Sequence, residues 1–372
     1  MINNNKEVFH IAFLLRDLGQ GGAERSSLRL ANGLADYGMK VTIFILKKKG
    51  EMINSVNPSI QIVDVKSSFI RLISEIRSMN IDFLLPIYTS MRALLAKAVL
   101  NIPFKVIISQ RNMFTMDRGA IQTRMRFLRC KLLYRFAAAC VCISEGVAEE
   151  MRTLNLLPAD KIHVIYNPVV NKELRSQINE PVDDPWFHKS NESVIVGAGR
   201  FGDQKDFATL LKAFAIVTKS RSNLKLLLLG EGKQRKMLEN MVIDLGLSEK
   251  VRMPGYITNP YPFMKKAALF VLTSRFEGFG NVVAEALACG CNVVSTDCKS
   301  GPSEILDNGK YGALAKVGNP EDIANTINIT LDNPLPEEFL ISRAEFFSEE
   351  RAVENYHSLF CAISDSKTSQ IT

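Results

Sequence analysis

The sequence predicts an α/β protein in which two doubly wound, Rossmann-like domains follow one another along the chain. Short apolar segments rich in β-branched residues alternate with segments of helical periodicity, which is typical of a parallel sheet covered by helices on both faces. This alternation stops between residues 171 and 191 and then resumes. The length of 372 residues also favours two domains, since a domain usually holds roughly 150 residues.

Each expected strand is a short apolar run, and most of these runs are followed by a helical pattern. In the first half the runs lie at residues 8–15, 41–46, 60–65, 83–85, 104–109, 138–143 and 162–165. In the second half they lie at residues 193–198, 224–229, 251–253, 269–272 and 292–295. Such sheets bind ligands at the carboxyl ends of their strands, so we expect the two domains to face each other across a cleft.

The break in the pattern sets the expected domain boundaries. The first domain takes residues 1–172 and the second takes residues 192–345. Between them, residues 173–191 carry Pro181 and Pro185 among Asn, Asp and Glu with no sustained period, which is typical of a linker. Residues 346–372 are expected to form a C-terminal helix and tail that return to the first domain.

Composition excludes several classes of protein. Apolar residues make up 47% and charged residues 23%, which excludes a disordered or collagen-like chain. No apolar run approaches the ~20 residues that span a bilayer, and residues 1–6 lack the apolar stretch of a secretion signal, so we expect a cytoplasmic protein. The seven cysteines are odd in number and form no Cys-x-x-Cys pair, so we expect reduced core thiols rather than disulfides or a zinc site.

Charge is distributed unevenly between the two halves. Residues 1–172 hold 24 lysines and arginines against 13 acidic residues, whereas residues 173–372 hold 22 against 26. A basic first half indicates an anionic partner for that half, and nucleic acid and an anionic membrane are the usual candidates.

A basic amphipathic helix is predicted over residues 121–136. Its apolar stripe is formed by Ile121, Met125, Leu128, Leu132 and Phe136, and it is flanked by Arg124, Arg126, Arg129, Lys131 and Arg135. Residues 118–143 hold six basic residues and no acidic residue. This pattern favours an anionic membrane surface over a helix that merely packs on the core. Nucleic acid is not expected, because no aromatic residues are interleaved for stacking on bases.

The most informative segment is residues 274–290, where a predicted strand leads through a loop containing Gly278 and Gly280 into a helix. The unpaired N–H groups at a helix start suit a phosphate or a sugar hydroxyl. Glu277 lies on the loop and Glu285 follows eight positions later, so the two carboxylates could bind different ends of one extended ligand. The alternative is that both are ordinary charges on a helix.

A second segment, residues 197–207, follows the first strand of the second domain. Its glycines allow a tight turn, and Arg200 and Lys205 place two cations at the end of the strand. A diphosphate is the natural ligand for such a pair, although two basic residues beside a helix are often simply solvated.

The loop at residues 19–25 follows the first strand and contains Gly19, Gly21 and Gly22. Its glycines do not fit Gly-x-Gly-x-x-Gly, and the next strand ends in Lys47-Lys48-Lys49 rather than in an acidic residue. A nicotinamide dehydrogenase is therefore not expected.

With Gly22-Ala23-Glu24, Gly199-Arg200 to Lys205 and the Glu277/Glu285 pair in this order, the chain resembles the retaining, nucleotide-sugar-dependent glycosyltransferases of the GT-B fold, family 4, also called glycosyl transferases group 1. The resemblance extends from about residue 8 to residue 360. Residues 300–305 are similar to the sugar-side loop of enzymes that build bacterial surface polysaccharides and lipid-linked oligosaccharides.

The resemblance implies a role for each motif. Arg200 and Lys205 would hold the donor diphosphate, and Glu285 the ribose hydroxyls. Glu277 would bind the donor sugar. The other expected contacts are backbone at Phe279, Gly280 and Asn281 for the sugar, Gly255 and Tyr256 for the base, and Gly21 and Gly22 for the phosphate and acceptor. Relatives also use a first-domain histidine, for which this sequence offers His10 and His163 without a clear assignment.

The resemblance also implies a reaction and its partners. A sugar would move with retained configuration from a nucleotide-sugar, expected to be UDP-linked, to a glycan or lipid-linked acceptor at the inner face of the cell membrane. No metal and no cofactor are expected, since no Asp-x-Asp motif lies near the donor site. Two alternatives remain open: a nucleotide-sugar epimerase of similar fold, and a non-catalytic membrane protein that binds sugar nucleotides.

Overall fold

The computed structural model describes residues 7–19, 21–100, 102–114, 120–188 and 192–365. The chain forms two compact units. The first contains residues up to Pro168 together with those from Glu349 onward, and the second runs from Val169 to Ser348. The last helix of the chain therefore belongs to the first unit.

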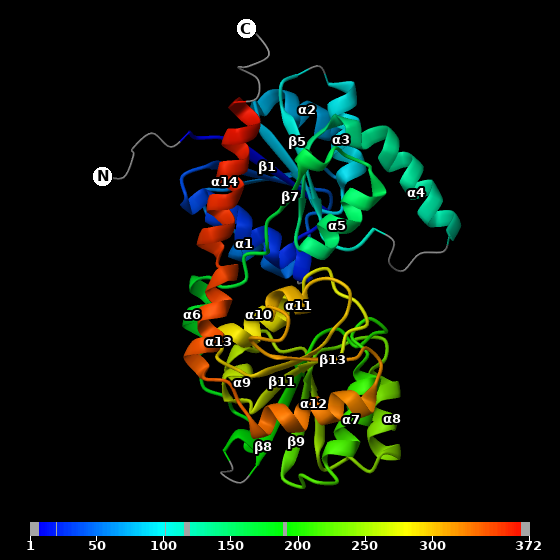
Figure 1. Cartoon of the computed structure of the whole chain (residues 1–372). Coiled ribbons are helices and arrows are strands. Elements are labelled where there is room, and N and C mark those ends of the chain that lie inside the picture. Colours follow the sequence, from blue (N-terminus) through cyan, green and yellow to red (C-terminus); the bar gives the residue numbers. More distant parts are fainter. Residues whose placement is uncertain (1–6, 20, 101, 115–119, 189–191, 366–372) are drawn as a thin grey trace. The chain divides into compact units, whose positions relative to one another are not determined.

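The first unit is a parallel sheet with helices between successive strands (Figure 1). Its strands run in the order β3-β2-β1-β4-β5-β6-β7. The strands are β1 (His10–Leu15), β2 (Lys40–Ile45), β3 (Gln61–Asp64), β4 (Phe83–Pro86), β5 (Lys105–Gln110), β6 (Ala137–Cys142) and β7 (Ile162–Val164). The helices are α1 (Gly22–Asp36), η1 (Glu51–Ser55), α2 (Phe69–Met79), α3 (Ser90–Val99), α4 (Ala120–Leu133), η2 (Tyr134–Phe136), α5 (Glu145–Leu154), η3 (Ala159–Lys161) and α14 (Glu349–Asp365).

Both faces of this sheet are buried, as its continuous apolar strands predict. Alternate residues of β1 point to opposite faces: Ala12 and Leu14 join a core with α2, α3 and α5, whereas Ile11 and Phe13 join a core with α1. Helix α14 completes the second core through Val353, Tyr356, Leu359 and Phe360. The C-terminal helix thus supplies apolar side chains that the first unit needs to cover its sheet.

The second unit repeats the same architecture. Its sheet is parallel, in the order β10-β9-β8-β11-β12-β13. The strands are β8 (Ser193–Ala198), β9 (Leu224–Leu229), β10 (Val251–Gly255), β11 (Leu269–Leu272), β12 (Val293–Thr296) and β13 (Ala313–Ala315). The helices are α6 (Lys172–Gln177), η4 (Pro185–Phe187), α7 (Phe207–Val217), α8 (Arg235–Asp244), α9 (Tyr261–Lys266), α10 (Asn281–Ala288), α11 (Pro302–Ile305), α12 (Pro320–Asp332), α13 (Glu337–Ala344) and η5 (Glu345–Phe347).

The predicted fold class is confirmed, since both sheets are parallel and doubly wound. Strand β13 was not predicted. The segment expected as a linker begins with α6, contains η4 and is counted with the second unit, and residues 189–191 of it lie outside the described residues. Helix α6 is capped by Asn171, whose side chain accepts a hydrogen bond from the Leu174 amide, and Leu174 is fully buried.

The cysteine side chains lie mostly in the core. Six of the seven cysteines are buried, Cys361 is half-buried, and all seven are free thiols.

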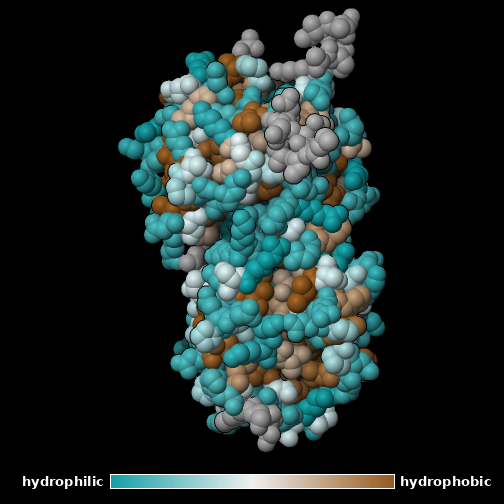
Figure 2. Space-filling model, turned by 90° about the vertical axis from the view of Figure 1, so that its left-hand side faces the viewer, coloured by the Kyte–Doolittle hydropathy of each residue, from teal (hydrophilic) through white to brown (hydrophobic). Residues whose placement is uncertain are grey.

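On the face shown in Figure 2, hydrophobic residues lie in small groups among hydrophilic ones, as is usual for protein surfaces. In the described part of the chain, no helix is both long enough and apolar enough to span a membrane.

Candidate functional site

The order of the second sheet places two loops at one point. Successive strands are added to the sheet in opposite directions from β8: β9 and β10 lie on one side of it, and β11, β12 and β13 lie on the other. The loops after β8 and β11 therefore leave the sheet side by side at its carboxyl edge, and ligands bind doubly wound sheets at this topological switch point. These loops carry Arg200 and Lys205 in one case and Glu277 in the other.

The loop between β8 and α7 brings Lys205 back over the end of its own strand. Gly199 has a φ of +152°, and a Cβ placed on it would lie 2.9 Å from Cε of Lys205. Glycine at this position therefore leaves room for the lysine stem. Arg200 is exposed, whereas only 15% of the Lys205 side chain is accessible.

The loop between β11 and α10 buries its carboxylate. Glu277 is 7% exposed, and Gly280, with a φ of +94°, is the residue before the first turn of α10. The N–H groups of this first turn give the site a positive helix end. The neighbouring Ser300–Gly301 turn braces the loop, since the Ser300 hydroxyl donates to the Gly278 carbonyl at 2.9 Å.

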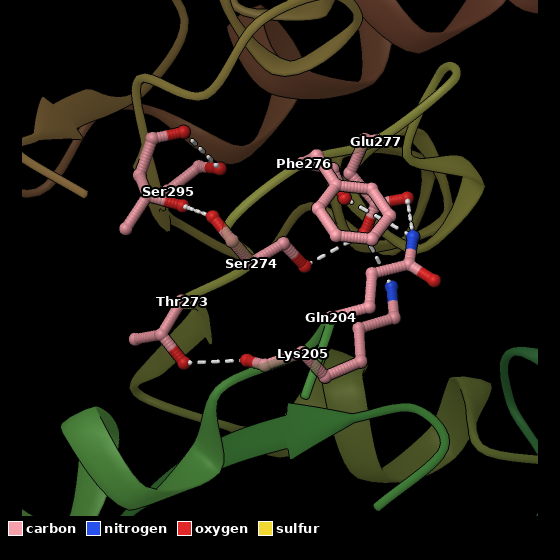
Figure 3. A network of polar contacts seen from close by, with 8 residues as sticks. Gln204, Lys205, Thr273, Ser274, Phe276, Glu277 and Ser295 are labelled. Carbon is pink, nitrogen blue, oxygen red and sulfur yellow. Dashed lines mark hydrogen bonds and ion pairs between the residues drawn. The ribbon is translucent and has the colours of Figure 1, made fainter. Parts of the chain in front are cut away.

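Lys205 and Glu277, 72 residues apart in sequence, form an ion pair of 2.7 Å between Nζ and Oε1 (Figure 3). The same Oε1 accepts a hydrogen bond of 2.7 Å from the hydroxyl of Ser274. The side-chain amide of Gln204 donates to the Phe276 carbonyl at 3.1 Å and lies 3.4 Å from Oε2 of Glu277. The structure thus brings together two of the residues that the sequence analysis singled out.

Further contacts fasten the two loops to each other. The hydroxyl of Thr273, fully buried, donates to the carbonyls of Lys205 and Asp206 at 3.0 and 3.1 Å. Arg275 Nε donates to Asp206 Oδ2 at 2.9 Å, and the Arg275 amide donates to the Gln204 carbonyl at 2.8 Å. The position of Lys205 is therefore tied to the loop that carries Glu277.

The other predicted donor residues of the second unit lie in and just before α10 and at the end of β10. Glu285 is in α10 and only 5% exposed, so it is not a solvated helix charge. Phe279 is buried and Asn281 is half-buried at the start of α10. Gly255 ends β10 and is buried, and Tyr256 beyond it is 46% exposed.

Cys298 lies close enough to the pair to be influenced by it. Burial, and to a lesser extent the Glu277 carboxylate, raise the pKa of the Cys298 thiol to about 12. A neutral thiol is a poor nucleophile, so this cysteine is unsuited to covalent chemistry at neutral pH. Among the described residues, no cluster of His, Cys, Asp and Glu could hold a metal ion.

In the first unit, the predicted glycines lie at the start of α1. Gly21 is the residue before the helix and Gly22 is its first residue. His10 is the first residue of β1, at the opposite edge of the sheet, and its ring nitrogens bond the Met79 carbonyl and the Thr42 hydroxyl. The structure therefore places His10 away from the carboxyl edge where ligands bind.

Helix α4 packs on the core with a different face from the predicted stripe. Its core contacts are made by Phe127, Cys130 and Leu133. Of the stripe, Met125, Leu128 and Leu132 are 53%, 60% and 57% exposed. Phe136 follows α4 in η2 and packs against the core, so it differs from these three, and the side chain of Ile121 lies outside the described residues.

The predicted basic residues flank the exposed stripe with one exception. Arg124, Arg129, Lys131 and Arg135 are exposed. Arg126 donates to the Phe114 carbonyl at 2.9 Å and stacks 4.1 Å from the centre of the Phe114 ring. Arg126 thus fastens α4 to the preceding loop.

Sequence reasoning missed Gln204, Ser274 and Thr273 as parts of the site. The sequence marks them only by position, since Gln204 immediately precedes Lys205, and Thr273 and Ser274 immediately follow β11. Polar residues at strand ends are common, so only the neighbouring positions of β8 and β11 reveal their role.

Family models match both halves of the chain. The glycosyltransferase family 4 model matches residues 20–172 and the glycosyl transferases group 1 model matches residues 180–346. The N-acetylgalactosamine-N,N'-diacetylbacillosaminyl-diphospho-undecaprenol 4-alpha-N-acetylgalactosaminyltransferase of Campylobacter jejuni is 32% identical over 54% of this chain, which spans about half (53%) of that relative. The lipopolysaccharide core biosynthesis glycosyltransferase LpsE of Rhizobium meliloti is 29% identical over 85% of this chain and 87% of its own length.

The fold is that of known glycosyltransferase structures. The Anabaena protein HepE, solved in complex with UDP-glucose, superposes with a TM-score of 0.77 at 19% identity, covering 96% of this chain and all of its own. The same family is indicated by the two family models, by the two parallel sheets and by the motifs at the end of β8 and after β11. This chain belongs to the GT-B glycosyltransferases, with a family 4 first half and a group 1 second half.

Proposed function

We propose that this glycosyltransferase moves a sugar, with retained anomeric configuration, from a UDP-sugar to a glycan or lipid-linked acceptor at the inner face of the cell membrane. The observation that carries the proposal is the Lys205–Glu277 pair at the switch point of the second sheet. A cation, a carboxylate and a helix N-terminus within one pair of loops suit a ligand that joins a diphosphate to a sugar.

Residues from different loops bind the different parts of the donor. Arg200 and Lys205 neutralise the diphosphate together with the start of α10, and Glu277 accepts hydrogen bonds from sugar hydroxyls. Glu285 binds the ribose, and Gly255 and Tyr256 contact the base. The complex of HepE with UDP-glucose, a protein of the same fold, supports a UDP-linked donor.

The chemistry follows from where charge develops. The bond from the anomeric carbon to the diphosphate oxygen breaks while the acceptor oxygen bonds to that carbon on the same face. The acceptor proton passes to the departing phosphate oxygen. Charge builds on the diphosphate as it leaves, so Arg200, Lys205 and the helix end stabilise the transition state more than the bound donor.

Two observations support a membrane-linked acceptor. The names of the Campylobacter and Rhizobium relatives refer to a diphospho-undecaprenol acceptor and to lipopolysaccharide core synthesis. In this chain, three large apolar side chains of α4 are exposed among four exposed cations. Such a surface suits an anionic headgroup layer, with the apolar stripe partly immersed.

Release of UDP tests the proposal directly. The protein is incubated with UDP-glucose, UDP-galactose or UDP-N-acetylglucosamine, with and without a bacterial lipid extract. A transferase releases UDP from one donor in a lipid-dependent manner. A nucleotide-sugar epimerase would instead convert the sugar without releasing UDP, and a non-catalytic binder would do neither, so each of these results would contradict the proposal.

A further inference from the structure

Ser274 is a buried hydroxyl that contacts the central carboxylate of the site. The residue is fully buried two positions beyond the end of β11, and its Oγ donates to Glu277 Oε1 at 2.7 Å. Its own carbonyl accepts a hydrogen bond of 2.6 Å from the Thr296 hydroxyl on the neighbouring strand β12. The sheet thus fixes the backbone of Ser274, and Ser274 in turn fixes one oxygen of Glu277.

Gln204 holds the same carboxylate from the other loop. Its side-chain amide is anchored at 3.1 Å on the Phe276 carbonyl, which immediately precedes Glu277, and it lies 3.4 Å from Oε2. The shorter contacts of the carboxylate, from Ser274 and Lys205, are both on Oε1 (Figure 3). The contact of Oε2, with Gln204, is longer than either of these. Exchanging it for a hydrogen bond with a sugar hydroxyl therefore costs less free energy than exchanging a contact of Oε1.

We propose that Ser274 and Gln204 are positioning residues that hold the Glu277 carboxylate in place while Lys205 turns to the donor diphosphate. The inference rests on the proposed function and deepens it. In the structure, Nζ of Lys205 lies 2.7 Å from Oε1 of Glu277. A diphosphate attracts that ammonium group, and a carboxylate held by the lysine alone would follow it. Ser274 and Gln204 hold the carboxylate independently of the lysine, so that Oε2 stays aimed at the sugar.

The critical variant is Ser274→Ala, which removes one hydroxyl from a small buried residue. The matched control is Ser295→Ala, because Ser295 is also fully buried and its hydroxyl donates to the Thr296 carbonyl at 3.2 Å, not to Glu277. Ser274→Thr retains a hydroxyl and serves as the conservative rescue. Gln204→Met, at a half-buried position, tests the second contact even if the buried variant folds poorly.

Turnover with the donor that the wild-type protein uses is compared with the affinity for UDP alone, which lacks the sugar. Loss of a hydrogen bond to a charged group should lower kcat about tenfold to a hundredfold in Ser274→Ala. Gln204→Met should lower it severalfold, since its contact with the carboxylate is longer. The donor KM and the UDP affinity should change less than about twofold, since Glu277 acts on the sugar. Ser295→Ala should match the wild type, and Ser274→Thr should recover most of the lost turnover.

Two results would overturn the role of these residues. One is unchanged kcat in both Ser274→Ala and Gln204→Met against an active wild type, which would leave the proposed function standing. The other is a parallel loss of UDP affinity and kcat, which would show a general structural defect. A wild-type protein that releases no UDP from any donor would instead contradict the proposed function, and this role with it.

Discussion

Lys205 and Glu277 have little access to solvent, so the loss of either leaves a buried charge without its partner. Breaking a buried pair in this way commonly costs about 3–5 kcal/mol of folding free energy. Ser274 and Gln204 offset part of this cost at Glu277 through their hydrogen bonds. Any variant of the pair must therefore be compared by its kinetic constants at a temperature where it remains folded.

Removal of the lysine should affect the transition state most strongly. In Lys205→Ala one cation is missing as charge builds on the leaving diphosphate, a loss of about 2.7–4 kcal/mol, so turnover should fall roughly a hundredfold to a thousandfold. The donor KM should rise much less, since the bound donor carries less charge at the breaking bond. The measurement is steady-state UDP release at saturating donor and acceptor.

The control and the second cation sharpen this test. Lys212→Ala removes an exposed lysine of α7 and should leave turnover unchanged. Strong non-additivity in the double variant with Arg200→Ala would show that both cations act on one group. Near-normal turnover in Lys205→Ala would mean that the donor diphosphate does not bind here.

At the level of individual residues, the sequence analysis proposed Lys205 and Glu277 as site residues but did not predict their contact. The pair joins residues on two loops, and it depends on β8 and β11 being neighbours in the sheet. Sheet order is a long-range property that no local pattern encodes. Gln204 and Ser274 were missed for the same reason, since their importance comes from the carboxylate they share.

Among the elements, α4 is where the sequence pattern and the structure together bear on a binding surface. A core helix would bury the stripe of Met125, Leu128 and Leu132, yet these side chains are more than half exposed and other residues make the core contacts. Periodicity predicted a helix here and three exposed positions of its stripe, but it was wrong about Phe136, which follows α4 in η2 and packs on the core, and it could not show which apolar face of α4 packs on the core.

Charge reversal on α4 should abolish membrane binding. Each exposed cation near an anionic surface contributes about 1 kcal/mol, so Arg124→Glu, Arg129→Glu and Lys131→Glu together should remove cosedimentation with phosphatidylglycerol-containing vesicles. Arg126 is left intact because it holds Phe114. Wild-type binding should weaken as salt is added.

The matched control reverses three exposed lysines in the second half of the chain, Lys212, Lys236 and Lys266. This variant has the same net charge as the α4 variant and should still bind the vesicles. Equal binding by the wild type and the α4 variant would show that the exposed stripe serves some other purpose.

Short elements account for most of what the sequence did not predict. Strand β13 has three residues, Ala313–Ala315, and lies at the edge of its sheet, so it lacks the long apolar run that marked the other strands. The segment expected as a linker contains α6 and η4, which are three to six residues long. Their formation depends on a cap and on one buried side chain in each, Leu174 and Trp186, rather than on sustained periodicity.

At the scale of the whole molecule, the two halves of the chain form sheets of the same architecture but differ in net charge. The first 172 residues are basic and the remainder is slightly acidic, as the proposed membrane contact of the first half would require. The fold class follows from the alternation of strands and helices, because that pattern repeats in each half.

The most direct test of the proposed function is transfer of labelled sugar into lipid. The protein is incubated with a lipid extract and the radiolabelled UDP-sugar from which it releases UDP, and the label in the organic phase is counted. Wild-type protein should incorporate label in step with UDP release. Glu277→Gln should incorporate at least tenfold less while binding UDP normally, because the carboxylate acts on the sugar. UDP release with no label in the lipid, or undiminished transfer by Glu277→Gln, would contradict the proposed function or its site.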